Sequence, residues 1–271
     1  MKDKFQFRRF FTYFRYDLVQ MWRVHGRSLL IIACLGVLSY VLNILFNLIF
    51  TQSWEPQGTA FRVSMIVVAY TILELFMARV YGQLTERKAG SAWLMIPASR
   101  LEKTVSMLLT VNIVIPVLFL AVYLSLDGIL SLADPTFGPS LAVTAGQFLS
   151  QAKDGLGEVM LDSPITVSGA SLVGLLILGN AVNFTFFLLC GLCFKKNKIG
   201  GALLVIFLLS VVLSILGAMA ILPNVSDLES LGEQEAIVMA TRFLNGLVIG
   251  SCVVLAGLVW GVWRRVKTLQ H

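Results

Sequence analysis

The feature that most constrains the fold is a set of six long apolar runs. They cover about 28–50, 61–83, 104–126, 168–194, 199–222 and 242–263. A helix needs about 20 apolar residues to cross the hydrocarbon of a bilayer, and each run reaches this length. Transmembrane strands would instead alternate polar and apolar residues over about ten positions. The sequence therefore predicts an all-α fold, a polytopic membrane bundle of six transmembrane helices that forms one domain over 1–271.

The distribution of charge indicates how these runs are oriented. The chain is 57% hydrophobic and only 13% charged, whereas soluble proteins average about 25% charged residues. All of its 21 Lys and Arg residues except Arg62, Lys153 and Arg242 precede the first run, follow the sixth, or lie in the second and fourth connections, if Arg79 near the end of the second run is counted with the second connection. Because cytoplasmic segments carry such an excess, we expect both termini in the cytoplasm. Membrane insertion explains the net charge of +6, so no nucleic-acid partner is predicted.

The segment 1–27, before the first run, is basic and aromatic. Its length, and the full length of the apolar run after it, argue against a cleaved signal peptide. On a helical wheel, one side carries Phe7, Phe10, Phe11, Phe14, Leu18, Met21 and Trp22. Helices with such a face lie along lipid head groups, so we predict an N-terminal amphipathic interfacial helix on the cytoplasmic side. A helix that binds a cytoplasmic partner is the alternative.

The second connection, 84–103, contains a helix start. Ser99 and Glu102 have the Ser-x-x-Glu spacing of a capping box, in which each side chain accepts a hydrogen bond from the backbone of the other residue. We therefore predict that the third membrane helix begins at Ser99. Pro97 disfavours helical geometry at the residue before it, so about 86–95 should form a separate short helix.

The same connection carries the candidate docking surface. Its apolar residues are Trp93, Leu94 and Ile96, and its charged residues include Glu86, Arg87, Lys88, Arg100 and Lys103. Such a surface suits docking of a partner protein or contact with lipid head groups. Plain anchoring at the membrane interface is an equal alternative.

Glu74 is the one acidic residue inside a predicted span, where a charge is costly unless it is paired. Its possible partners are Asn43, Asn47, Arg79, Asn180 and Asn183. In a functional interpretation, Glu74 belongs to a substrate path or a proton relay. In a structural interpretation, it is a carboxyl group hydrogen-bonded inside the bundle. The lack of a second acid for a relay favours the structural interpretation.

Further structure is expected on the outer side and within the third span. The longest outer connection, 127–167, is acidic, and 141–151 within it suits one short helix. Another short helix is predicted at about 233–240, before the sixth span. Pro116 frees a backbone carbonyl of the third span and predicts a kink there.

Motifs for catalysis or cofactor binding are scarce. Cys190 and Cys193 have Cys-x-x-Cys spacing, but no histidine or further cysteine accompanies them, which favours buried thiols over a redox or metal site. With only His25 and His271 as histidines, neither a metal site nor a catalytic triad is predicted. The chain lacks a Gly-x-x-x-x-Gly-Lys-Ser/Thr phosphate loop, so it is not predicted to be an enzyme, and no cofactor is expected.

The sixth span contains two pairs of glycines at small-xxx-small spacing. They are Gly246 with Gly250, and Gly257 with Gly261. Such pairs let another helix approach closely. They predict packing either against helices of the same chain or at the seam of an oligomer.

The connection 84–103 resembles the loop between the second and third spans of ABC-exporter permeases of the second type, which have the type V exporter fold. Its Pro-Ala-Ser-Arg-Leu-Glu-Lys part, 97–103, is most similar to that of family members from Bacteroidetes-like bacteria. The six spans, the cytoplasmic termini, the amphipathic start with Tyr16-Asp17-Leu18 and the outer helix before the sixth span are also similar. The acidic connection 127–167 departs from the family pattern, in which the larger outer elaboration often precedes the sixth span.

This resemblance implies a permease subunit of a bacterial inner membrane. A second permease copy or a paralogue would complete the transport path, and a separate ABC-type ATPase would supply the energy. In that family a coupling helix in this loop docks on the ATPase. Carried over to this chain, the coupling residues would be Glu86, Arg87, Lys88, Trp93, Leu94 and Ile96.

Two other functional hypotheses stand beside the exporter. The first is an ion-coupled carrier centred on Glu74, although the two halves of the chain lack the convincing internal repeat that is typical of carriers. The second is a membrane scaffold or sensor that transports nothing.

Overall fold

The computed structural model describes residues 5–51, 58–85, 93, 95–134, 137–147, 150, 169–221 and 233–268. Within these ranges every regular element is helical, which confirms the all-α fold class. Among these described residues, five helices are long and apolar enough to cross a membrane, judged by length and composition. The chain is therefore a multi-pass membrane protein, and its described part contains one candidate span fewer than the six that the sequence predicts.

The first candidate span is one helical stretch, Phe7–Phe50, which begins well before the apolar run. It contains α1 (Phe7–Ala33) and α2 (Leu35–Phe46), and a π-helical segment, η1 (Asn47–Thr51), follows. The predicted boundary between an interfacial helix ending at 27 and a span beginning at 28 is not present. No proline interrupts this stretch, so the α-helix continues to a turn at Cys34.

The first half of α1 is buried on a face that overlaps one edge of its aromatic side, where Phe10 is also buried. Tyr13, Asp17 and Met21 are buried and lie along one helical stripe. By contrast, Phe7 and Phe11 are 72% and 64% exposed. Part of the aromatic side predicted from the helical wheel thus remains open to lipid head groups.

The second and third predicted spans correspond to two longer helical stretches. The second is α3 (Thr59–Val80), followed by a 3-10 turn, η2 (Gly82–Thr85). The third consists of α5 (Arg100–Leu109), the π-helical η3 (Thr110–Val114) and α6 (Ile115–Ala133). Because α6 continues to Ala133, the outer connection begins later than the predicted residue 127.

Pro116 changes the third span without breaking it. It is the second residue of α6 and directly follows the π-helical η3. The Ile115 N–H bonds to the Thr110 carbonyl, one residue further back than in an α-helix. The helix therefore accommodates Pro116, which has no backbone N–H to donate, by widening one turn into a π-helix.

The last part of the chain forms α8 (Gly169–Cys193), α9 (Lys198–Ile221) and α11 (Glu233–Thr268). The predicted short helix at 233–240 is the first part of α11 and not a separate element. The fifth predicted span corresponds to α9, of which the stretch Lys198–Val212 is apolar but shorter than the five candidate spans. Within the predicted outer connection, 141–147 is helical, and 148–149 and 151 lie outside the described residues.

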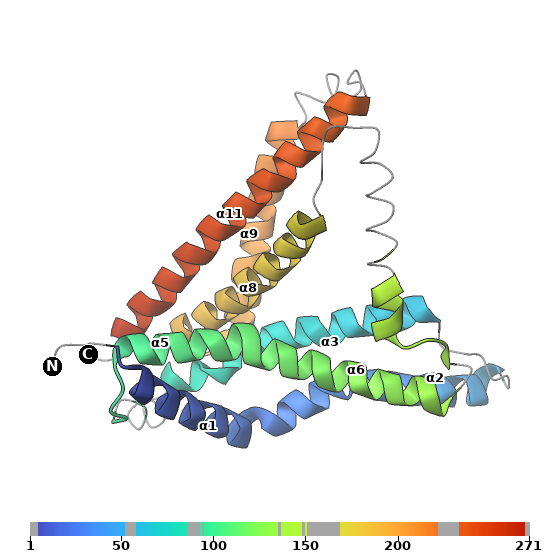
Figure 1. Ribbon diagram of the computed structural model, residues 1–271, viewed down its shortest axis with the longest axis horizontal. Helices are drawn as coiled ribbons and strands as arrows, with labels where there is room; N and C mark the ends of the chain where they lie inside the picture. The colour runs from blue at the N-terminus through green and yellow to red at the C-terminus, as the bar shows by residue number, and fades with distance from the viewer. Residues whose placement is uncertain are drawn as a thin grey trace.

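The helices form two groups (Figure 1). Helices α1, α2, α3, α5 and α6 run together, and α8, α9 and α11 lean away from them. The groups meet at the end of the molecule where α1 begins and α11 ends, and there α8 packs on α3 and α11 on α5. A Cβ atom at Gly191 of α8 would overlap the Ala78 carbonyl of α3. Glycine at this position is what allows the two backbones to touch.

Candidate functional site at the start of α5

Helix α5 starts at a set of hydrogen bonds centred on the fully buried carboxylate of Glu102. The Arg9 guanidinium of α1 pairs with both carboxylate oxygens, each at 2.8 Å. The backbone N–H groups of Gln6 and Ser99 donate to the same carboxylate at 3.0 and 2.8 Å. Ser99 is the N-cap of α5, and its hydroxyl accepts the Glu102 N–H at 3.2 Å, as the Ser-x-x-Glu spacing predicts. One side chain thus satisfies backbone donors at the starts of both α1 and α5.

A second acid, Asp17, lies on the buried face of α1. Its Oδ2 accepts hydrogen bonds from the hydroxyls of Tyr81, at 2.8 Å, and Ser106, at 2.5 Å. Tyr81 directly follows α3 and Ser106 belongs to α5, so Asp17 connects three helices. A buried carboxylate without such donors would cost about 1–3 kcal/mol or more.

Trp93 is anchored to the same region. Its indole N–H donates to the Tyr13 hydroxyl of α1 at 3.0 Å. The Lys103 ammonium of α5 donates to the Trp93 carbonyl at 3.0 Å and lies 4.4 Å from the centre of the Trp93 ring. These contacts compensate the burial of Lys103, which is only 1% exposed. We call the set Arg9, Tyr13, Asp17, Trp93, Glu102 and Lys103 the α1–α5 junction.

A cavity of about 190 Å³ adjoins the α1–α5 junction. Its lining combines aromatic and polar groups, among them Tyr16, His25, Tyr81, Gln83 and Ile96. The described residues contain no group of His, Cys, Asp and Glu side chains able to hold a metal ion. The side chains of the α1–α5 junction are suited to connecting helices to one another through hydrogen bonds.

The structure places only some of the predicted coupling residues. Glu86, Arg87, Lys88 and Leu94, and most of the predicted short helix at 86–95, lie outside the described residues. The Trp93 side chain is only 8% exposed and faces inward. Its contacts with Tyr13 of α1 and Lys103 of α5 hold it there. Ile96 is partly buried against the core. Between these two residues, Met95 is 83% exposed.

Glu74 of α3 has a hydrogen-bond partner on another helix. Asn183 of α8 donates to its carboxylate at 3.3 Å. Asn180, one turn earlier on α8, donates instead to the Leu176 carbonyl of its own helix. Asn183 was one of the partners predicted for Glu74. Asn183 is exposed and Glu74 is half-buried, so this contact is compatible with both the structural and the functional interpretation of Glu74.

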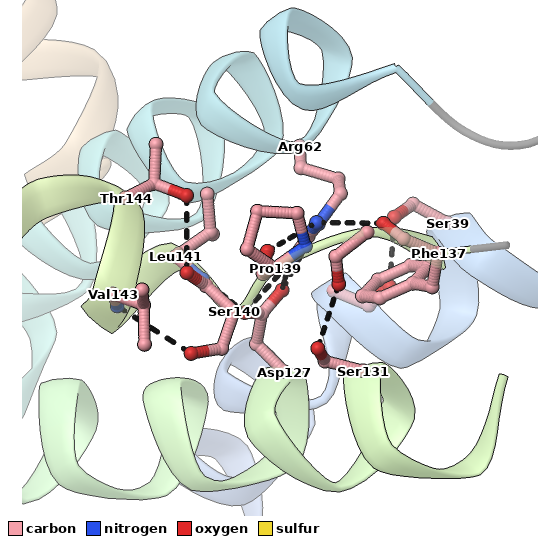
Figure 2. A network of polar contacts seen from close by, with 12 residues as sticks. Ser39, Arg62, Asp127, Ser131, Phe137, Pro139, Ser140, Leu141, Val143 and Thr144 are labelled. Atoms are coloured by element: carbon pink, nitrogen blue, oxygen red, sulfur yellow. Dashed lines mark hydrogen bonds and ion pairs between the residues drawn. The ribbon is translucent and has the colours of Figure 1, made fainter. Parts of the chain in front are cut away.

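A second polar cluster lies at the opposite end of α3 and α6. Figure 2 shows the Arg62 side chain of α3 reaching toward Asp127 of α6 and the segment 137–141. Arg62 and Asp127 form a buried ion pair, 3% and 6% exposed, with contacts of 2.6 and 2.8 Å. The guanidinium also donates to the carbonyls of Phe137 and Pro139, at 2.9 and 3.0 Å, and lies 3.9 Å from the centre of the Phe137 ring. The Leu141 N–H donates to Asp127 at 2.7 Å. This pair fastens the start of the outer connection to two membrane helices.

The glycine pairs of α11 differ in their surroundings. A Cβ atom on Gly261 would lie 3.2 Å from the Leu189 side chain of α8, so this glycine packs within the chain. Among the described residues, nothing lies within 4 Å of such an atom on Gly246, Gly250 or Gly257. An oligomer seam at these three glycines stays a prediction.

From the sequence we predict no contacts for four residues of these clusters, which are Tyr13, Asp17, Arg62 and Asp127. A signal was present for Asp127, because apolar residues continue past it to Ala133. An acid inside an apolar helix requires a partner. Arg62, at the start of the neighbouring span, was the available basic residue.

Comparisons with protein-family models, with curated proteins and with solved structures found no match to this chain.

Proposed function

We propose that this chain is the membrane-spanning permease subunit of an ATP-binding-cassette exporter in a bacterial inner membrane, with both termini in the cytoplasm. It would move a substrate across the membrane with ATP hydrolysed by a separate ABC-type ATPase. The observation that carries the proposal is the α1–α5 junction, where the connection 84–103 is tied to two helices at once. The resemblance of this connection to the exporter loop supplies the class of partner.

A junction of this kind is suited to transmitting movement. Trp93 is held by Tyr13 of α1 and by Lys103 of α5, so a displacement of the connection would carry both helices with it. From α5 the movement would pass through η3, where the π-helical turn before Pro116 is a candidate hinge. Rigid-body tilting of two permease halves would then alternate access to the substrate path.

The ATPase would bind the connection through residues other than Trp93. The candidates are the charged residues Glu86, Arg87 and Lys88 and the exposed Met95. Trp93 takes a positioning role, because its side chain is bound inside the permease. Acidic groups on the ATPase are the expected counterparts of Arg87 and Lys88.

Co-purification tests this docking surface. The chain is co-expressed with candidate ATPases that carry a phosphate-binding loop, and an Arg87→Glu/Lys88→Glu variant is compared with wild type. Charge reversal should release the ATPase while the permease still inserts in the membrane. The matched control is Arg264→Glu, an exposed basic residue near the end of α11. Unchanged retention of the ATPase by the double variant, or equal loss in the control, would contradict docking at this connection.

A Glu74→Gln variant separates the exporter from an ion-coupled carrier. The amide can still bond to Asn183 but can no longer exchange a proton. An exporter should keep its ATP-driven activity, whereas a carrier centred on Glu74 should lose gradient-driven uptake. Transport by purified protein in vesicles, driven either by ATP with the ATPase or by an imposed gradient, distinguishes the two.

A further inference from the structure

The turn between α8 and α9 borders a basic hollow of about 690 Å³. Its basic residues come from three places: Arg79 near the end of α3, Lys195 in the turn, and Lys198 at the start of α9. Gln83 and Asn197 add polar groups, and no acidic side chain of the described residues lines the hollow. We call this the basic hollow.

Two cationic side chains of the basic hollow are available to bind an anion. Lys198 donates to the Gly82 carbonyl at 2.6 Å, which fixes its position at the edge of the hollow. The side chains of Arg79 and Lys195 are exposed, and neither forms a hydrogen bond or an ion pair with another described residue. Membrane orientation explains why basic residues occur in this turn. It does not explain why they converge with Arg79 of another helix around one hollow.

We propose that the basic hollow binds the phosphate head group of an anionic phospholipid. The apolar stretches of α3, α8 and α9 all end at it, so it lies at the level of the head groups. Leu203 and Phe207 are 47% and 66% exposed and lie one and two turns along α9 from Ile199, which lines the hollow. Residues at this spacing share a helix face, so acyl chains of a lipid held at the hollow would have an apolar surface to follow.

Lipid binding to the purified full chain tests this proposal. Phosphatidylglycerol is titrated into the protein in phosphatidylcholine nanodiscs, and the bound lipid is measured by native mass spectrometry. An Arg79→Gln/Lys195→Gln variant should bind phosphatidylglycerol about thirtyfold more weakly, because each basic residue near an anionic lipid contributes roughly fivefold. Lys195→Gln alone should weaken binding about fivefold, which keeps the test informative if the double variant unfolds.

Lys196→Gln is the matched control, because Lys196 is an exposed residue of the same turn that does not line the hollow. It should bind phosphatidylglycerol as wild type does. An equal loss in this control would show diffuse surface attraction and overturn the proposal. Equal binding of phosphatidylcholine, or displacement of the lipid by millimolar inorganic phosphate, would overturn it as well, the latter by indicating a site for a free anion. The outcome does not depend on the proposed exporter function.

Discussion

At the scale of single residues, buried charged side chains connect neighbouring helices at each end of the bundle. Glu102 has no exposed surface and accepts from Arg9, Gln6 and Ser99. Glu102→Gln should lower the free energy of unfolding by about 1–3 kcal/mol, because Arg9 loses its ionic partner while glutamine can still cap the helix. Glu102→Ala should cost about 1 kcal/mol more, because the capping bond is lost as well.

Unfolding in mixed micelles of sodium dodecyl sulfate measures both changes at Glu102. Leu101→Ala provides the control, because this neighbour is 43% exposed and contributes nothing to the ion pair. Equal losses for the Gln and Ala variants would contradict a separate contribution from the cap.

The Arg62–Asp127 pair makes a different prediction at the same scale. Arg62→Met should destabilise the protein by about 3–5 kcal/mol, because Asp127 would remain buried without its cation. The double variant Arg62→Met/Asp127→Leu should recover part of this loss, since no uncompensated charge is left. A double-mutant cycle of unfolding free energies measures the coupling. Simple additivity of the two single variants would show that the pair contributes no interaction energy.

At the scale of elements, the local sequence predicts where helices form, but it does not predict which helices contact each other. Ser99 and Glu102 are three residues apart, so spacing alone predicts the start of α5. Trp93 and Tyr13 are 80 residues apart, and apolar periodicity does not say which helices face each other. For the same reason Trp93 was expected on the surface. The end of α6 was misplaced because Asp127 was assigned to the outer connection, although pairing with Arg62 allows it inside a helix.

The contact between α3 and α8 provides a prediction at this scale. Gly191→Ala should lower thermal stability markedly, because its Cβ would overlap the Ala78 backbone carbonyl and the helices would have to separate. Gly179→Ala, also on α8, should be close to neutral, since nothing lies within 4 Å of its Cβ position. Thermal unfolding midpoints of the two variants in detergent give the comparison. A neutral Gly191→Ala variant would mean that α3 and α8 are not in backbone contact.

At the scale of the whole molecule, α11 presents an apolar face that the described part of the chain leaves open. Ile249 and Val253 are 66% and 67% exposed on either side of Gly250 in the sequence. Lipid alone can cover such a face, but the proposed exporter needs two permease halves that meet. If they meet at α11, small residues there would allow the closest approach of the two backbones.

Gly250→Leu should therefore weaken association of two copies about tenfold, because a large side chain holds the helices apart. Energy transfer between labelled copies in vesicles, followed as the protein is diluted with lipid, measures this association. Gly128→Leu on α6 is the matched control, since a Cβ there also meets nothing within 4 Å. Unchanged association of the Gly250 variant would mean that lipid, and not a second copy, covers this face of α11. The two permease halves would then have to meet through other helices.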